Sequence, residues 1–212
     1  MYPERGMLDC NTYVIAGSSG VIIDPGSPEN VSSLLDDLRQ DGIEPSSIST
    51  IVNTHLHLDH SWGNEAFKET TNARIIFHPL QKKYYDVSVV KTAQFFGFNP
   101  PDFKEDECLE KNEMAIGDLE YQLIPAPGHS LDSVCFYCAK EKVLVCGDVL
   151  FAGNTGRADL PGGNAEQLKQ SIENLSRLEI EYLLPGHMGI VQGVGNVKQN
   201  FDFIREHVFA WM

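Results

Sequence analysis

The stretch TIVNTHLHLDH, residues 50–60, is the most informative part of the sequence. It places three imidazoles and a carboxylate directly after a short apolar run, and functional groups often sit on loops that a rigid strand end supports. The four side chains are His55, His57, Asp59 and His60. In extended chain, the intervening leucines leave His55, His57 and Asp59 on one side, and His60 breaks the alternation. This pattern predicts ligands for two adjacent metal ions.

Three more metal-competent side chains follow apolar runs. His129 comes after residues 119–125, Asp148 after 143–146 and His187 after 182–184, each beside glycine. Imidazole nitrogen and carboxylate oxygen suit zinc, and a catalytic zinc site keeps a position open for water. Seven ligands shared by two ions leave such positions open. We therefore expect two divalent metal ions, zinc above all, with iron, manganese or a mixed centre as alternatives.

The order of these motifs carries a family resemblance. THLHLDH, PGHS, CGD and PGHM, together with IDPG at 23–26 and GRADLPGG at 156–163, resemble the metallo-β-lactamase superfamily in its glyoxalase II-like (hydroxyacylglutathione hydrolase-like) branch. The resemblance implies an α/β (α+β) fold, a four-layer αβ/βα sandwich of two mixed β-sheets with helices on the outer faces. It covers nearly the whole chain, so we expect one domain over residues 1–212.

The resemblance also implies roles for the seven side chains. Site one would take His55, His57 and His129, site two would take Asp59, His60 and His187, and Asp148 would bridge them. The implied activity is cleavage of a small-molecule ester or thioester by a metal-bridged hydroxide, which Asp59 would orient as a catalytic residue. Flavodiiron oxygen reductases carry glutamate at the position of His57, so a hydrolase is favoured over that branch.

Two other functions compete with hydrolysis. A mononuclear iron oxygenase similar to the persulfide dioxygenases would use His55 or His57 with His129 and Asp148. A metal-binding domain without turnover is disfavoured, because structural zinc sites are closed and usually contain cysteine, and none of the seven candidate ligands is a cysteine. Glyoxalase II enzymes carry an extra C-terminal helical region that binds glutathione, whereas 25 residues follow His187 here. The resemblance therefore does not extend to glutathione specificity.

Candidate pocket residues flank the metal motifs. The segment GRADLPGG could line the mouth of the site, or it could be a glycine-rich turn tied by an Arg157–Asp159 ion pair. Aromatic residues at 84–98 could roof the site over an apolar part of the substrate, or they could be ordinary helix packing. We expect the substrate pocket to include Ser130, Asn154, Arg157, Tyr84 and Phe95.

Composition limits the partners. The 212 residues are 42% hydrophobic and 22% charged, which is typical of a globular chain, and the net charge of −14 disfavours nucleic acid. No apolar signal segment and no 18-residue apolar stretch are present, so we expect a cytoplasmic location without membrane contact. Five cysteines argue against a disulfide framework. Cys135 and Cys138 lie three apart in a predicted strand, so their thiols should face opposite ways.

Hydrophobic periodicity predicts the secondary structure. A hairpin is expected over 12–24, and a helix is expected from Ser27-Pro28 to Gly42 with leucines on one face. The other predicted elements are strands at 48–52, 74–77, 119–125, 133–138, 143–146 and 182–184, a helix near 61–68 and a helix opening at Asn164. A last helix carries an apolar stripe from Val197 to Trp211, which would pack internally or against a second copy in a homodimer.

Overall fold

The computed structural model describes residues 1–17 and 19–212, which form two mixed β-sheets. The first sheet has the order β1-β2-β3-β4-β5, and it is parallel except for β1. The second has the order β13-β12-β9-β8-β7-β6, in which the β12–β9 pair is parallel. The strands of the first sheet are β1 (Tyr13–Ile15), β2 (Gly20–Ile23), β3 (Ile48–Val52), β4 (Arg74–Phe77) and β5 (Glu107–Cys108). Those of the second are β6 (Glu113–Ile116), β7 (Leu119–Pro125), β8 (Val134–Cys138), β9 (Val143–Gly147), β12 (Tyr182–Pro185) and β13 (Val191–Gln192).

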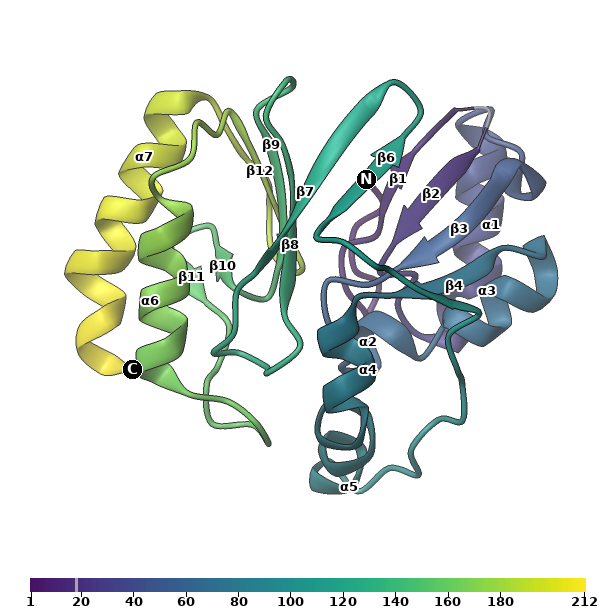
Figure 1. Cartoon of the computed structure of the whole chain (residues 1–212), viewed down its shortest axis with the longest axis horizontal. Helices are drawn as coiled ribbons and strands as arrows, with labels where there is room; N and C mark the ends of the chain where they lie inside the picture. The colour runs from purple at the N-terminus through teal and green to yellow at the C-terminus, as the bar shows by residue number, and fades with distance from the viewer. Residues whose placement is uncertain (18) are drawn as a thin grey trace.

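Helices cover the outer face of each sheet (Figure 1). Helices α1 (Val31–Gln40) and α3 (Asn64–Thr71) lie on the first sheet, and α6 (Ala165–Leu175) and α7 (Val194–Phe203) lie on the second. A helical segment lies between β4 and β5 in the chain. It is formed by α4 (Pro79–Tyr85), η3 (Asp86–Lys91) and α5 (Thr92–Phe95). The predicted four-layer sandwich is confirmed.

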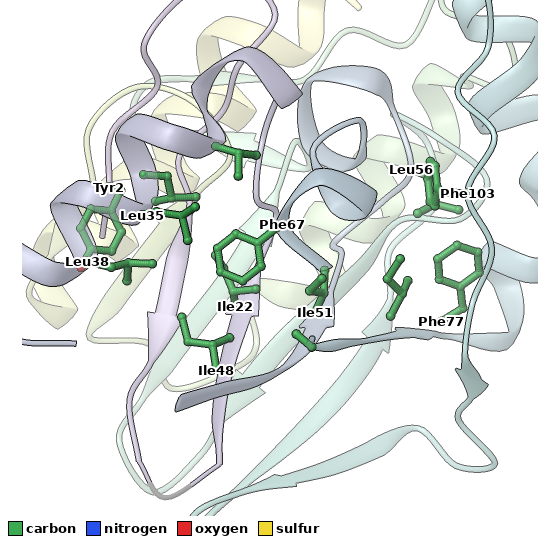
Figure 2. Close-up of a cluster of buried hydrophobic side chains, with 14 of the residues drawn as sticks. Tyr2, Ile22, Leu35, Leu38, Ile48, Ile51, Leu56, Phe67, Phe77 and Phe103 are labelled. Carbon is green, nitrogen blue, oxygen red and sulfur yellow. The ribbon is translucent and has the colours of Figure 1, made fainter. Parts of the chain in front are cut away.

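Strand alternation divides the core into three layers. On β2, Ile22 packs toward the helices, and Val21 and Ile23 pack between the sheets. Figure 2 shows the first of these layers, where Phe67 lies next to Ile22. The sheet-to-sheet layer holds Val52 and Phe136 among others, and the third layer lies beneath α6 and α7. Each sheet is thus buried on both faces, which fixes the register of the strands that carry the site.

The sequence predicted the main elements closely. The hairpin and all six predicted strands are present, and Asn164 caps α6 by accepting from the backbone N–H of Gln167 at 2.9 Å. Helix α1 ends where expected, because Gly42 adopts a φ of +75° and the N–H of Ile43 donates to the carbonyl of Leu38. The thiols of Cys135 and Cys138 point into different core layers, as predicted, and both are buried and free.

Two helical predictions need correction. Instead of one helix over 61–68, a turn named α2 (Leu58–Ser61) precedes α3, and the break follows from Gly63, which approaches the backbone of Gly26 and donates to its carbonyl at 2.7 Å. The stripe on the last helix packs internally through Val197, Phe201 and Ile204, but Trp211 is 89% exposed. A π-helical turn, η4 (Ile204–Val208), changes the residues per turn and rotates Trp211 away from the core.

No helix within the described ranges is long and apolar enough to cross a membrane.

Candidate metal centre

Loops at one edge of the sandwich carry the seven predicted ligands. Strands β7, β9 and β12 run in the same direction, so their carboxyl ends meet at this edge, where His129, Asp148 and His187 follow them. The segment after β3 reaches the same place from the other sheet. The structure brings all seven side chains together in two adjacent groups, one of His55, His57 and His129, the other of Asp59, His60, Asp148 and His187.

The first group consists of three convergent imidazole nitrogens. Nε2 of His129 lies 3.2 Å from Nε2 of His55 and 2.9 Å from Nδ1 of His57. All three residues are buried, with at most 3% of their surface exposed. Burial, followed by the charge of the neighbouring histidines, lowers the pKa of His55 and brings that of His57 down to about 3. Neutral imidazoles with free lone pairs are the form that binds a metal ion.

The second group alternates imidazoles and carboxylates. Nε2 of His187 lies 3.2 Å from Oδ2 of Asp59 and 3.4 Å from Oδ2 of Asp148, and Nε2 of His60 lies 3.2 Å from Oδ1 of Asp148. Although burial opposes it, hydrogen bonding to Asp148 and Asp59 raises the pKa of His187 to about 11. The proton on His187 offsets the negative charge of Asp59 and Asp148, and a bound divalent cation would offset the same charge in its place.

Asp148 connects the two groups. Its Oδ2 lies 3.6 Å from Nε2 of His129 in the first group and 3.4 Å from Nε2 of His187 in the second. Within the described part of the chain, Asp148 Oδ1 and His60 Nε2 are buried without a hydrogen-bond partner. Buried polar atoms are nearly always satisfied, and an ion between these two would satisfy both. The donor set therefore fits a pair of borderline divalent metals.

The outward-facing ring nitrogens of His129, His187 and His60 are held by further contacts, which fix the tautomers. Nδ1 of His129 donates to the carbonyl of Arg157 at 2.7 Å, and Nδ1 of His187 donates to Glu4 at 2.6 Å. Nδ1 of His60 donates to Oδ2 of Asp24 at 2.9 Å. With a metal ion in place of the additional proton, these contacts would keep the remaining proton on Nδ1 and leave the Nε2 lone pair directed at the centre. His57 is reversed, since its Nδ1 faces His129.

Strand alternation explains only part of this grouping. His55 and His57 share the first group, as the extended chain predicts. Asp59 instead joins His60, because the helical turn α2 begins at Leu58, directly after His57 with its extended ψ of 156°. The side predicted for Asp59 from strand alternation is therefore wrong, while the split implied by the family resemblance agrees with the positions of all seven side chains.

A cavity of about 370 Å³ opens over the two groups. Of the five predicted pocket residues, Arg157 lies in its lining. The side chain of Ser130 is buried against Ser133, and Asn154 lies in β11 (Asn154–Thr155), paired with β10 (Leu150–Phe151), on the wall of a different cavity. Tyr84 and Phe95 also lie outside the lining, which Phe96 joins in place of Phe95.

The segment GRADLPGG combines both interpretations given to it. Gly156, Arg157 and Leu160 line the cavity, and the guanidinium of Arg157 also forms a bidentate ion pair with Asp159 at 2.7 Å. A Cβ at Gly156 would collide with the carbonyl of Asp148 and lie 2.9 Å from Nδ1 of His129. Glycine is thus required at position 156, because the backbone there passes too close to Asp148 and His129 to leave room for a side chain.

Sequence reasoning missed two buried carboxylates beside the centre. Asp24 contacts His60, as described, and it follows an apolar strand in the same way as the predicted ligands do, a signal that could have found it. Asp132 accepts from the backbone N–H of Leu56, between two histidine ligands, at 2.9 Å and from Ser88 at 2.6 Å. The sequence gives no comparable signal for Asp132.

Comparison with known proteins agrees with this geometry. The profile of the Metallo-beta-lactamase superfamily matches residues 5–187. The chain belongs to the metallo-β-lactamase superfamily. Within this superfamily, it is 34% identical to a probable metallo-hydrolase of Methanocaldococcus jannaschii, over 84% of this chain and 86% of that one. It is 31% identical to the hydroxyacylglutathione hydrolase of Ectopseudomonas mendocina, over 74% of this chain and 51% of the relative.

Solved structures of the metallo-β-lactamase superfamily are similar over almost the entire chain. The B3 metallo-β-lactamase BLEG-1 superposes with a TM-score of 0.80 at 28% identity, covering 94% of this chain and 96% of that one. TTHA1623, solved in a di-iron-bound form, gives a TM-score of 0.76 at 29% identity, covering 94% and 98%. This chain is therefore similar to metal-dependent hydrolases, among them a glyoxalase II-like enzyme.

Proposed function

We propose that the chain is a binuclear metallo-hydrolase that cleaves an ester or thioester of a small molecule. The observation that carries this proposal is the position of Asp148 between an all-imidazole group and a mixed group at the floor of a cavity. His55, His57 and His129 would hold one ion, Asp59, His60 and His187 the other, and Asp148 would contact both. Zinc is the proposed metal, and iron is the alternative, given the di-iron form of TTHA1623.

The proposed reaction adds water to the carbonyl carbon. The C–S or C–O bond then breaks, the leaving sulfur or oxygen takes a proton, and the products are a carboxylic acid and a thiol or alcohol. When bound, the two ions would lower the pKa of water toward 7 and polarise the carbonyl oxygen. The carboxylate of Asp59 lines the cavity and is partly exposed, so it can accept a hydrogen bond from the attacking water and orient it.

The test combines metal analysis with a substrate panel. The unchelated protein should contain two metals per chain and hydrolyse members of a thioester, ester and lactone panel, and a chelator should abolish the activity. If the protein instead contains one iron per chain and consumes oxygen in the presence of a persulfide, the function is oxygenation and the proposed hydrolysis is wrong. The panel includes a β-lactam, because a lactamase is among the similar structures.

A variant pair ties the activity to the proposed ligands. His57→Ala should lose a metal and at least about 100-fold in kcat/KM, since a small displacement of reacting groups already has an effect of that order. His207→Ala is the matched control, because the His207 ring is mostly exposed on the last helix. Full metal content and an unchanged rate in His57→Ala would refute the proposal.

A further inference from the structure

The wall of the cavity above the metal centre is apolar. Leu58, Phe151 and Leu160 are almost fully buried there, and Phe96 and Met7 stand more exposed among the lining residues. These side chains come from five separate positions in the chain and surround the space that a substrate would enter. Apolar surface of this kind stabilises an apolar ligand roughly in proportion to the area it covers.

The charge around this cavity is unusual for a protein that binds an anion. Apart from the histidines of the centre, Arg157 is the one basic side chain among the cavity-lining residues that the structure describes. One edge of its guanidinium is already engaged, because Nε and Nη2 each lie 2.7 Å from an oxygen of Asp159. The net charge of −14 further repels an anionic substrate.

On these grounds, and resting on the proposed hydrolase function, we propose a substrate class: thioesters or esters with an apolar acyl group and an uncharged leaving group. The acyl chain would lie against Leu160, Phe151 and Phe96. Asp159 acts as a specificity residue, since its carboxylate offsets the charge of Arg157, the one guanidinium among the described lining residues that could bind the carboxylates of a glutathione or the phosphates of a coenzyme A leaving group.

The first experiment varies acyl length with one neutral leaving group. Acetyl, butanoyl, hexanoyl and octanoyl thioesters of N-acetylcysteamine should show kcat/KM rising about fourfold for each methylene that enters the cavity. Phe96→Ala should flatten this rise. Phe95→Ala is the matched control. The Phe95 ring is next to Phe96 in sequence but lies outside the cavity lining, so this variant should leave the rise unchanged.

The second experiment varies the charge of the leaving group with the acyl group held constant. Wild-type protein should prefer the N-acetylcysteamine thioester to the glutathione thioester. Asp159→Asn should raise kcat/KM for the glutathione thioester about threefold to tenfold, and only at low salt, without improving the neutral substrate. Asp202→Asn is the control, because Asp202 on α7 is an exposed ion-pair partner of Arg205 and lies outside the cavity lining.

The outcomes separate the two proposals. If no ester or thioester is hydrolysed, the proposed function fails. If the acetyl thioester is hydrolysed as fast as the octanoyl one, or the glutathione thioester is preferred, the hydrolase stands and the substrate class is wrong. An equal response of both leaving groups to Asp159→Asn would overturn the role given to Asp159.

Discussion

Asp24 and His60 form a fully enclosed pair, with Oδ2 of Asp24 2.9 Å from Nδ1 of His60. The same carboxylate accepts from both the N–H and the hydroxyl of Thr54, at 2.7 and 2.6 Å. Asp24 also has a positive φ of 56°, which aspartate and asparagine tolerate better than other non-glycine residues. The carboxylate therefore keeps the proton of His60 on Nδ1 and leaves Nε2 free for the centre.

Asp24→Asn should weaken metal binding at the second site. Asparagine keeps the backbone conformation, but its amide nitrogen would face the N–H of His60, which favours the opposite tautomer with the proton on Nε2. We expect a loss of about 10-fold to 100-fold in affinity for one of the two ions, measured by metal titration with a competing chelator. The exposed Asp36→Asn serves as the control, and unchanged affinities for both ions would contradict the role of Asp24.

Gly186→Ala should disrupt the centre through steric contact alone. A Cβ at this position would collide with Oδ1 of Asp148 and lie 2.7 Å from Cε1 of His60. Displacement of two ligands by about an ångström should lower kcat/KM about 100-fold and reduce the metal content below two per chain.

Gly189→Ala provides the comparison for Gly186→Ala, because a Cβ there meets nothing within 4 Å. Circular dichroism would establish that both variants fold. Normal metal content in a folded Gly186→Ala variant would show that the site can accommodate the methyl group.

Local chemistry explains why much of the fold and site was predictable. Short apolar runs such as that in Val143–Gly147 predicted strands, and the placement of His129, Asp148 and His187 after strands predicted an edge site. These signals depend on near neighbours in sequence, and the common direction of β7, β9 and β12 then brings the ligands together.

The pocket was less predictable because it depends on tertiary position. Phe95 and Phe96 look equivalent in sequence, but the end of α5 places only Phe96 in the cavity lining. Ser130 directly follows a predicted ligand, yet its hydroxyl turns to Ser133, 2.7 Å away. The contact of Asp132 with Leu56 spans 76 positions, so no local pattern could reveal it.

Ser88→Ala should destabilise the fold by leaving the buried Asp132 short of a donor. Asp132 is fully buried, and Oγ of Ser88 lies 2.6 Å from its Oδ1. Loss of a hydrogen bond to a buried charged group costs about 1–3 kcal/mol, which urea unfolding of metal-free protein would measure. The exposed Ser32→Ala should cost less than about 0.5 kcal/mol. Equal stabilities of the two variants would mean that Ser88 contributes nothing to this network.

His78 should make stability depend on pH independently of the metal centre. It caps α4, since its Nδ1 accepts from the N–H of Leu80 at 3.2 Å and its Nε2 pairs with Asn112 at 2.9 Å. Burial lowers the pKa of His78 below its usual 6.5, against the opposing contact with Asn112. The unfolded chain therefore takes up the proton first as the pH falls, and protonation also removes the lone pair that forms the cap.

The stabilising contribution of His78 should thus be complete at pH 8 and decline as the pH falls through about 6.5. His78→Asn keeps a capping oxygen but has no titrating group. When the pH is lowered from 8 to 5, the wild type should therefore lose about 1 kcal/mol of unfolding free energy relative to the variant, which is the usual contribution of an N-cap. Urea unfolding of both proteins in chelator measures this difference and cancels the titration of the ligand histidines. Parallel pH profiles for the two proteins would show that His78 takes up its proton equally in the folded and the unfolded chain, and would contradict the lowered pKa in the folded protein.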